Sequence, residues 1–265
     1  MPKTTKYVAK VPDADGVIHY TAQENAVWRD LVAQQQPNVE RLAAAPFLAG
    51  QRRLNLPVDR VPQCVEVSEV LEDLTGWRVA PVPALIGFGR FFKMLSEKTF
   101  PAASFIRDRE SFDYIEEPDI FHEIYGHTPL LTDPRFAKFS QRIGETGLAC
   151  DPADYSWLIR LYWFTVEFGL IREGEQIKAL GSGLASSPGE LSHSIFGPSV
   201  IRKPFDVIDI LRTPYRIDIN QPIYFVLDDV EQLLEASERD LLVDIKKAQA
   251  LGLYKPVFPP KPEAA

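Results

Sequence analysis

Histidine is scarce in this sequence, and two of its four histidines lie close together. Residues 121–127 read Phe-His-Glu-Ile-Tyr-Gly-His, which places His122 and His127 five positions apart. This is not the H-E-x-x-H pattern of zinc peptidases, in which the histidines are four positions apart. Around an α-helix, side chains four positions apart are separated by about 40°, whereas side chains five positions apart are separated by about 140°. Both rings could hold one metal ion only if the helix loosens near His127, and Gly126 and Pro129 favour such a distortion.

A third candidate ligand lies in a strongly apolar stretch. Glu167 is the only charged residue between positions 161 and 171. A buried carboxylate is costly unless a positive partner or a metal ion compensates it. An Arg or Lys partner would satisfy Glu167, but with His122 and His127 it also completes the two-histidine, one-carboxylate set of non-haem Fe(II) oxygenases. The same residue types bind catalytic zinc, so the spacing does not name the metal.

These residues alone are compatible with three kinds of protein. One is an iron oxygenase, and another is a zinc hydrolase that uses Glu123 as its general base. The third is a non-catalytic helical protein in which a cation merely neutralises Glu167. Oxygen consumption, the bound metal and the effect of Glu167→Gln would separate them.

Longer motifs around these residues resemble the pterin-dependent aromatic amino acid hydroxylases, most closely the bacterial phenylalanine 4-hydroxylases. The resemblance covers nearly the whole chain. In order, it is carried by Glu-Pro-Asp-Ile-Phe-His-Glu-Ile-Tyr-Gly-His at 117–127, Tyr-Trp-Phe-Thr-Val-Glu-Phe-Gly-Leu at 162–170, Gly-Ser-Gly-Leu-Ala-Ser-Ser-Pro-Gly-Glu at 181–190 and Arg-Thr-Pro-Tyr-Arg-Ile-Asp at 212–218.

The resemblance implies a fold, a reaction and a set of cofactors. The fold would be mainly α, a basket-like helical catalytic domain with a few short β-strands. The activity would be that of a phenylalanine 4-monooxygenase, which hydroxylates L-phenylalanine to L-tyrosine. It would use O2 and a tetrahydropterin, either tetrahydrobiopterin or a bacterial equivalent, at a mononuclear Fe(II). By the same resemblance, His122, His127 and Glu167 are the catalytic metal ligands.

The resemblance also implies residues that bind the two organic reactants. On the pterin side, Phe91 would stack on the ring, Glu123 and Tyr162 would line its site, and Ile86 would contact it through its backbone. From the residues alone, Phe91 would be a core aromatic, and Glu123 could equally be a solvated helix-face residue.

On the substrate side, Arg107 would bind the amino acid carboxylate, since a guanidinium forms a bidentate fork with a carboxylate. Asp119 would brace Arg107, Trp163 would form a wall for the substrate ring, and Ser186 would lie near the metal. Without the resemblance, Arg107 could be a surface ion-pair residue, Asp119 a helix cap and Trp163 a core residue.

Two positions depart from the animal members of the family. Ile115 stands where they carry a threonine that helps to bind substrate, and Pro101 stands where they carry a histidine near the pterin. Substrate binding would then depend more on Arg107 and Ser186. The pair Gly181 and Gly183 would by itself indicate a turn. His19 and His193 match no functional position.

Composition restricts the class of protein further. The chain has 265 residues, 45% of them hydrophobic, and a net charge of −8 with no block of five basic residues, which argues against a nucleic-acid partner. No segment approaches the ~18 apolar residues of a membrane span. The two cysteines, Cys64 and Cys150, fit a reducing compartment. We expect a cytoplasmic monomer with one catalytic domain, 1–265, frayed at about 1–15 and 255–265, without a regulatory or tetramerisation domain and not activated by phenylalanine.

Capping and periodicity predict the elements that carry these residues. An early helix should start after Thr21, where a capping box with Glu24 is present, and end near Gln35 because Pro37 follows. Other helices are expected at 65–74, 87–95, 134–149, 152–172 and 229–252. Extended segments are expected at 77–86, 215–219, 223–227 and in the tail from 256.

Overall fold

The chain forms a mainly helical fold with a few short strands, as expected. The computed structural model describes residues 7–83, 86–113, 115 and 117–260. The elements, in chain order, are α1 (Ala22–Leu42), α2 (Ala45–Leu54), α3 (Cys64–Thr75), β1 (Arg78–Val82), α4 (Phe88–Ser96), β2 (Thr99–Ala103), η1 (Phe121–His127), α5 (Thr128–Leu131), α6 (Pro134–Ala149), η2 (Pro152–Asp154), α7 (Tyr155–Tyr162), η3 (Trp163–Glu167), β3 (Leu170–Glu173), β4 (Gln176–Ala179), α8 (Ser182–Ala185), α9 (Pro188–Phe196), β5 (Ile201–Pro204), α10 (Val207–Arg212), β6 (Ile223–Leu227), α11 (Glu231–Glu238) and α12 (Leu241–Leu251).

Several helices begin and end at the caps that the sequence supplies. Thr21 and Glu24 form a capping box at the start of α1. The side chain of Asp133 caps α6, whose first residue is Pro134. Gly76 ends α3 in the left-handed region, with a φ of 74°. These features confirm the helices expected at 65–74 and 134–149, and α4 confirms the one expected at 87–95.

The strands form two small sheets. β1 and β2 pair in parallel, with Arg78 opposite Thr99. The second sheet has the order β4-β3-β6-β5, in which β3 and β4 form an antiparallel hairpin while β6 runs parallel to both β3 and β5. β6 lies in the middle of this sheet and is buried along its whole length, which accounts for its unbroken apolar sequence.

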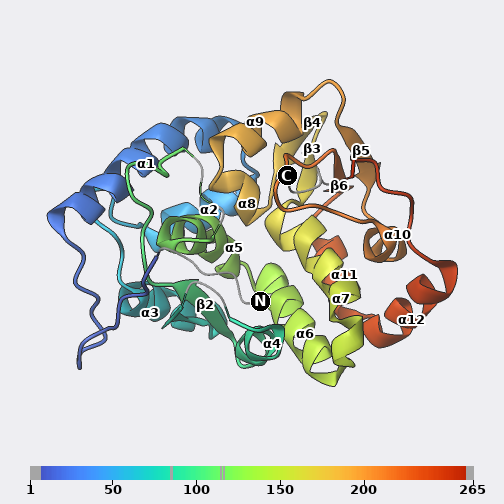
Figure 1. Ribbon diagram of the computed structural model, residues 1–265, viewed down its shortest axis with the longest axis horizontal. Coiled ribbons are helices and arrows are strands. Elements are labelled where there is room, and N and C mark those ends of the chain that lie inside the picture. The colour runs from blue at the N-terminus through green and yellow to red at the C-terminus, as the bar shows by residue number, and fades with distance from the viewer. Residues whose placement is uncertain (1–6, 84–85, 114, 116, 261–265) are drawn as a thin grey trace.

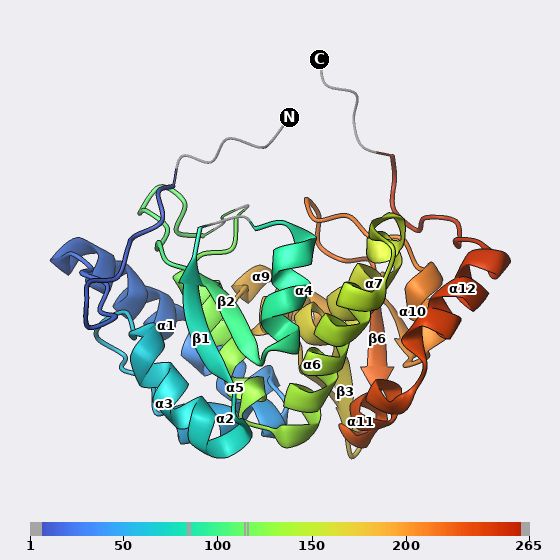
Figure 2. The ribbon, with the colours of Figure 1, turned by 90° about the horizontal axis from the view of Figure 1, so that it is seen from below.

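Helices surround a central region in which η1, η3 and α8 meet. Figure 1 shows α5 and α8 near the middle of the molecule, with α1 and α9 on one side and α4 and α6 on the other. Figure 2 shows β1, β2 and α3 at one end and α10 and α12 at the opposite end. α8 packs against both η1 and η3, and one continuous apolar core links these elements to the outer helices. No helix in the described part of the chain is long and apolar enough to cross a membrane.

The first helix is longer than its sequence predicts. α1 continues to Leu42 with Pro37 inside it, although an internal proline costs roughly 3 kcal/mol or more. Beyond the proline, Val39 is fully buried and Leu42 nearly so. Burying such side chains stabilises the helix by about 1.5–3 kcal/mol each, which is enough to offset the proline.

The helix expected at 152–172 is helical only as far as Glu167. After η2, α7 and η3, the chain turns into β3 at Leu170. Leu170 and Ile171 pair with Val226 and Leu227 of β6. A short apolar run has the same pattern in a buried helix and a buried strand, so the sequence could not locate this change.

Of the two strands expected near the C-terminus, only 223–227 forms, as β6. Residues 215–219 are irregular. The side chain of Gln221 donates to the backbone carbonyls of Arg216 and Ile219, the groups that a neighbouring strand would otherwise bind. The alternation of apolar and polar residues at 215–219 was therefore a misleading signal.

The single helix expected at 229–252 is two helices, α11 and α12. Asp240 caps α12 by accepting from the N–H groups of Leu242 and Val243. The break changes the phase of the helical face, so Leu241 and Ile245 are buried while Leu242 is 37% exposed. β1 confirms extended structure at 78–82. The expectations for positions 84 and 85 and for the end segments 1–6 and 261–265 fall outside the described residues.

Candidate functional site

The two histidines meet because the segment that carries them is a π-helix. η1 spans Phe121–His127 and therefore makes i→i+5 hydrogen bonds, which bring residues five apart onto one face. The Nε2 atoms of His122 and His127 lie 3.1 Å apart. The loosened turn that the spacing required is confirmed. Gly126 permits it to pack closely, since a Cβ there would lie 2.8 Å from the backbone oxygen of Ser182.

A second π-helix brings Glu167 to the same point. η3 ends at Glu167, whose Oε1 lies 3.2 Å from Nε2 of His127 and whose Oε2 lies 3.6 Å from Nε2 of His122. These segments are 40 residues apart in the sequence. The structure therefore brings together all three residues that we expect to be metal ligands.

The protonation states of these groups suit a divalent metal ion. Burial is the main cause that lowers the pKa of His122, to about 4, so its imidazole is neutral at neutral pH. Burial alone would raise the pKa of Glu167, but the adjacent imidazoles and a hydrogen bond from Ser182 outweigh it and hold that pKa at about 2. The carboxylate is thus ionised, as a ligand must be.

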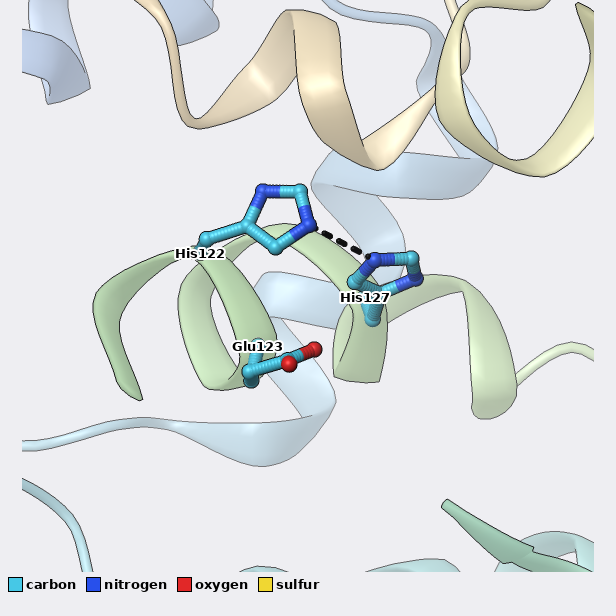
Figure 3. Close-up of side chains that lie close together, drawn as sticks. All are labelled: His122, Glu123 and His127. Carbon is cyan, nitrogen blue, oxygen red and sulfur yellow. Dashed lines mark hydrogen bonds between the residues drawn. The ribbon is translucent and has the colours of Figure 1, made fainter. Parts of the chain in front are cut away.

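Glu123 is a competing carboxylate. It can place one oxygen within 4.8 Å of the ligand nitrogens of His122 and His127. In Figure 3, the dashed line joins the two imidazoles, and the carboxylate of Glu123 lies below both rings in this view. Burial and the negative charge of Glu167 raise the pKa of Glu123 well above its usual range, which favours its neutral form. Glu167 is therefore the better third ligand.

Two serines of the α8 region support the cluster. Ser186 Oγ lies 2.9 Å from Nδ1 of His122, so it contacts the ring nitrogen that faces away from His127. Ser182 Oγ lies 3.1 Å from both His127 Nε2 and Glu167 Oε2. Such neighbours orient metal ligands. We expected Ser186 but not Ser182, although their spacing of four residues, one helical turn, was a readable signal.

A family model for biopterin-dependent aromatic amino acid hydroxylases matches residues 3–254. The chain belongs to this family. Over 257 residues it is 49% identical to phenylalanine-4-hydroxylase of Vibrio cholerae serotype O1, and this match covers 97% of this chain and 89% of that protein. The resemblance seen in the sequence motifs is thereby confirmed, and the hydroxylase interpretation is favoured over the zinc hydrolase and the non-catalytic protein.

Solved structures of other hydroxylases have the same fold. The apo phenylalanine hydroxylase of Colwellia psychrerythraea 34H matches with a TM-score of 0.92 and 49% identity, covering 94% of this chain and 97% of that one. The phenylalanine hydroxylase of Chromobacterium violaceum with bound oxidised Fe(III) matches with a TM-score of 0.87 and 34% identity, covering 92% and 89%. The two imidazoles and one carboxylate of this chain fit such an iron centre.

A cavity of about 540 Å³ opens beside the cluster, and His122 and Glu167 form part of its wall. Three of the four residues expected on the substrate side line it: Arg107, Trp163 and Ser186. The fourth, Asp119, is fully buried behind Arg107 and forms a bidentate ion pair with it.

The hydroxylase residues expected on the pterin side lie elsewhere. Phe91 and Tyr162 meet edge to face with ring centroids 5.3 Å apart, and Tyr162 stacks near His127 at 6.3 Å. Glu123 is buried on the same segment as the histidines. Ile86 is half-buried just before α4, and no hydrogen bond links it to the other three within the described residues. None of the four lines the cavity beside His122 and Glu167.

The remaining positions singled out in the sequence have local roles. Ile115 is half-buried and lines the cavity, whereas Pro101 is buried in β2. His19 is exposed and pairs with Asp13. His193 approaches the backbone oxygen of Gln221 with its Nε2, at 3.1 Å.

Glu190 and Gln221 also line the cavity, and sequence reasoning assigned neither of them a role. Glu190 is buried, and it is the last residue of the motif at 181–190. Its place in that motif was a signal from which a role could have been predicted. Gln221 carries no such signal, because an isolated glutamine in a loop has no distinctive spacing.

Proposed function

We propose that this chain is a phenylalanine 4-monooxygenase that converts L-phenylalanine to L-tyrosine with O2 and a tetrahydropterin. The observation that carries the proposal is the convergence of His122, His127 and Glu167 at the wall of a cavity that also contains Arg107. These three residues would hold the metal ion, and the adjoining cavity would place the reactants next to it.

On the substrate side, Arg107 binds the amino acid carboxylate and Trp163 packs against the aromatic ring. Asp119 accepts from Nε and Nη2 of Arg107. The remaining nitrogen, Nη1, makes one long hydrogen bond of 3.4 Å to the backbone oxygen of Phe112, and its second N–H is the one that it can offer to a ligand. The cavity excludes bulk water from the ring while keeping the charged end of the amino acid on a fixed cation.

On the opposite side of the histidines, Phe91 stacks on the pterin and Tyr162 supports Phe91 through their edge-to-face contact. Glu123 offers a buried carboxyl group to the polar edge of the pterin. When bound, Fe(II) and the tetrahydropterin together reduce O2, supplying one oxygen atom to the substrate ring and the other to the pterin.

The decisive experiment is product analysis. Purified protein with Fe(II), tetrahydrobiopterin and O2 is given L-phenylalanine, L-tryptophan or L-tyrosine in parallel. We expect tyrosine from L-phenylalanine as the main product, formed together with oxidised pterin. Protein that contains iron and makes no tyrosine under these conditions would contradict the proposal, and preferential hydroxylation of L-tryptophan would reassign the substrate.

The ligand assignment has a separate test with a matched pair of variants. Glu167→Gln should lose stoichiometric iron while keeping the folded far-UV spectrum. Glu123→Gln should keep the iron, because Glu123 is proposed to face the pterin. Iron retained in Glu167→Gln and lost in Glu123→Gln would exchange the two roles.

We also propose that the protein works as a monomer with one catalytic domain in the cytoplasm. The buried, unpaired thiols of Cys64 and Cys150 support a reducing environment. Light scattering coupled to size-exclusion chromatography should give a mass near 29.9 kDa, the mass of one chain. A dimer mass that persists on dilution would contradict the monomer.

A further inference from the structure

Gln221 is a buried glutamine whose side chain holds together the irregular segment beside the substrate cavity. It lies between α10 and β6, two residues before the start of β6, and only 1% of it is exposed. Its side-chain Nε2 donates to the backbone oxygens of Arg216 and Ile219, at 2.8 Å and 3.0 Å. These two bonds close residues 216–221 into a compact loop, which we call the 216–221 loop.

The same glutamine connects the loop to the substrate wall. Its Oε1 accepts a hydrogen bond of 3.1 Å from the indole Nε1 of Trp163. Trp163 is further held between two rings, Tyr215 and Phe168, each with its centroid 4.4 Å from that of Trp163. The hydrogen bond to Gln221 is directional, whereas ring stacking permits sliding, so the bond fixes where the indole lies in its plane.

A buried carboxylate holds the backbone of Gln221 in turn. Glu190 accepts from the Gln221 N–H at 2.7 Å and from the Tyr224 hydroxyl at 2.5 Å. On the other side of the same residue, His193 meets the Gln221 carbonyl oxygen. Both Glu190 and His193 lie on α9, so Gln221 joins α9, the 216–221 loop and η3 at one point.

The cavity depends on this junction. Residues 217–221 line it without interruption, and Trp163 lines it from η3, four residues before Glu167. Both surfaces are oriented by the one Gln221 side chain. A change at this side chain therefore alters the shape of the cavity on two sides. Within the described part of the chain, the Gln221 side chain makes no hydrogen bond to His122, His127 or Glu167.

We propose that Gln221 is a positioning residue that sets substrate selectivity by fixing Trp163 and the 216–221 loop. The inference rests on the proposed function, because it assumes that an aromatic amino acid occupies the cavity. It does not require contact between Gln221 and the substrate. An apolar pocket discriminates weakly between rings that differ by a few atoms. A wall residue held in one position restricts which ring fits, and this can increase the selectivity of the site.

The first test is spectroscopic and does not depend on turnover. The chain has four tryptophans, so a proton–nitrogen correlation spectrum should contain four indole N–H signals, and Trp163→Phe identifies one of them. Gln221→Met, which keeps a similar volume without the amide, should displace the Trp163 signal and leave the other three in place. An unmoved Trp163 signal would overturn the proposal.

The second test measures selectivity as the ratio of the values for two substrates. A variant with a smaller folded fraction affects both values equally, so this ratio does not change. Calorimetry on the Fe(II)-loaded protein without oxygen gives the dissociation constants of L-phenylalanine and L-tryptophan, and kinetics gives their kcat/KM values. In Gln221→Met both ratios should change by about threefold or more, with iron stoichiometry unchanged. Ratios equal to those of the wild type would refute the proposal even if the wild type makes tyrosine.

Two comparisons distinguish a positioning role of Gln221 from a general effect on the stability of the protein. Gln249→Met removes a half-buried amide of α12 that donates to Asp154 of η2, away from the cavity, and should leave both ratios unaltered. In a double-mutant cycle, the effects of Gln221→Met and Trp163→Phe should be less than additive, since both remove the bond between these two residues, although only Gln221→Met also frees the 216–221 loop. Additive effects would show that Gln221 does not act through Trp163. If Gln221→Met does not fold, Gln221→Asn, one methylene shorter, is tested by the same criteria.

Discussion

Arg107 and Asp119 form a bidentate ion pair that is almost completely removed from solvent. Nε and Nη2 of the guanidinium each donate to one carboxylate oxygen at 2.8 Å, and the side chains are 7% and 0% exposed. Asp119 also accepts from the backbone N–H of His122. The ion pair thus joins the cation that should bind substrate to the start of the metal-binding segment.

Asp119→Asn should destabilise the protein strongly. It leaves a buried guanidinium without its counter-ion, which typically costs about 3–5 kcal/mol of unfolding free energy. The KM for L-phenylalanine should rise by about tenfold or more because Arg107 loses its fixed orientation. Urea unfolding and steady-state kinetics measure the two effects. Asp133→Asn is the control, since its partner Arg135 is 37% exposed and the loss should be smaller. An unchanged KM would contradict the role of Arg107.

The same ion pair predicts a specific pH dependence of stability. Burial alone would raise the pKa of Asp119, but the charge and hydrogen bonds of Arg107 outweigh it and lower this pKa below the ordinary 3.8. The carboxylate therefore stabilises the folded state above pH 3.8, and this contribution is lost as the pH falls through the lowered pKa. The difference in unfolding free energy between wild type and Asp119→Asn should be constant at neutral pH and shrink on acidification. Urea titrations at a series of pH values measure it, and a difference that grows in acid would contradict the assignment.

Ser182→Ala should weaken metal binding without unfolding the protein. The hydroxyl lies 3.1 Å from Oε2 of Glu167, and loss of such a neighbour of a ligating carboxylate typically lowers metal affinity about 10–100-fold. Competition with a chelating dye measures the affinity. Ser194→Ala removes an equally buried hydroxyl whose partner is the Leu191 carbonyl, and should leave the affinity unchanged. Equal effects of the two substitutions would mean that the loss is merely structural.

Gly181→Ala should disturb the Glu167 segment. A Cβ at this position would lie 2.1 Å from the backbone oxygen of Glu167, so one of the two segments must move. We expect a loss of about 1–3 kcal/mol in unfolding free energy, together with weaker iron binding. Gly189→Ala is the matched control, since nothing lies within 4 Å of its added methyl group. Thermal unfolding with and without Fe(II) would show both effects, and a Gly181→Ala protein as stable as Gly189→Ala would refute the close approach.

Much of the metal cluster could be predicted because its chemistry is rare in the sequence. Two histidines with an unusual spacing and one carboxylate in an apolar run leave few alternatives, and the required loosening of the helix near Gly126 is present as a π-helix. Ser182 and Gln221 could not be found in the same way. Serine and glutamine occur widely, and their roles arise only when distant segments pack together.

The fold was predictable where local signals decide it and unpredictable where tertiary contacts override them. The caps at Thr21 and Asp133 begin helices as expected. Pro37 does not end α1, since buried residues beyond it stabilise the helix. The start of β3 at Leu170 depends on pairing with β6, a partner more than 50 residues away in the sequence, which no local pattern reveals.

The four-residue helix α8 and the serine that follows it have a mechanical consequence. Ser182 contacts His127 and Glu167, and Ser186, one turn later, contacts His122. Any displacement of this one turn therefore changes the surroundings of all three ligands at once. Damage anywhere along this turn should therefore weaken metal binding through all three ligands together instead of through one ligand alone.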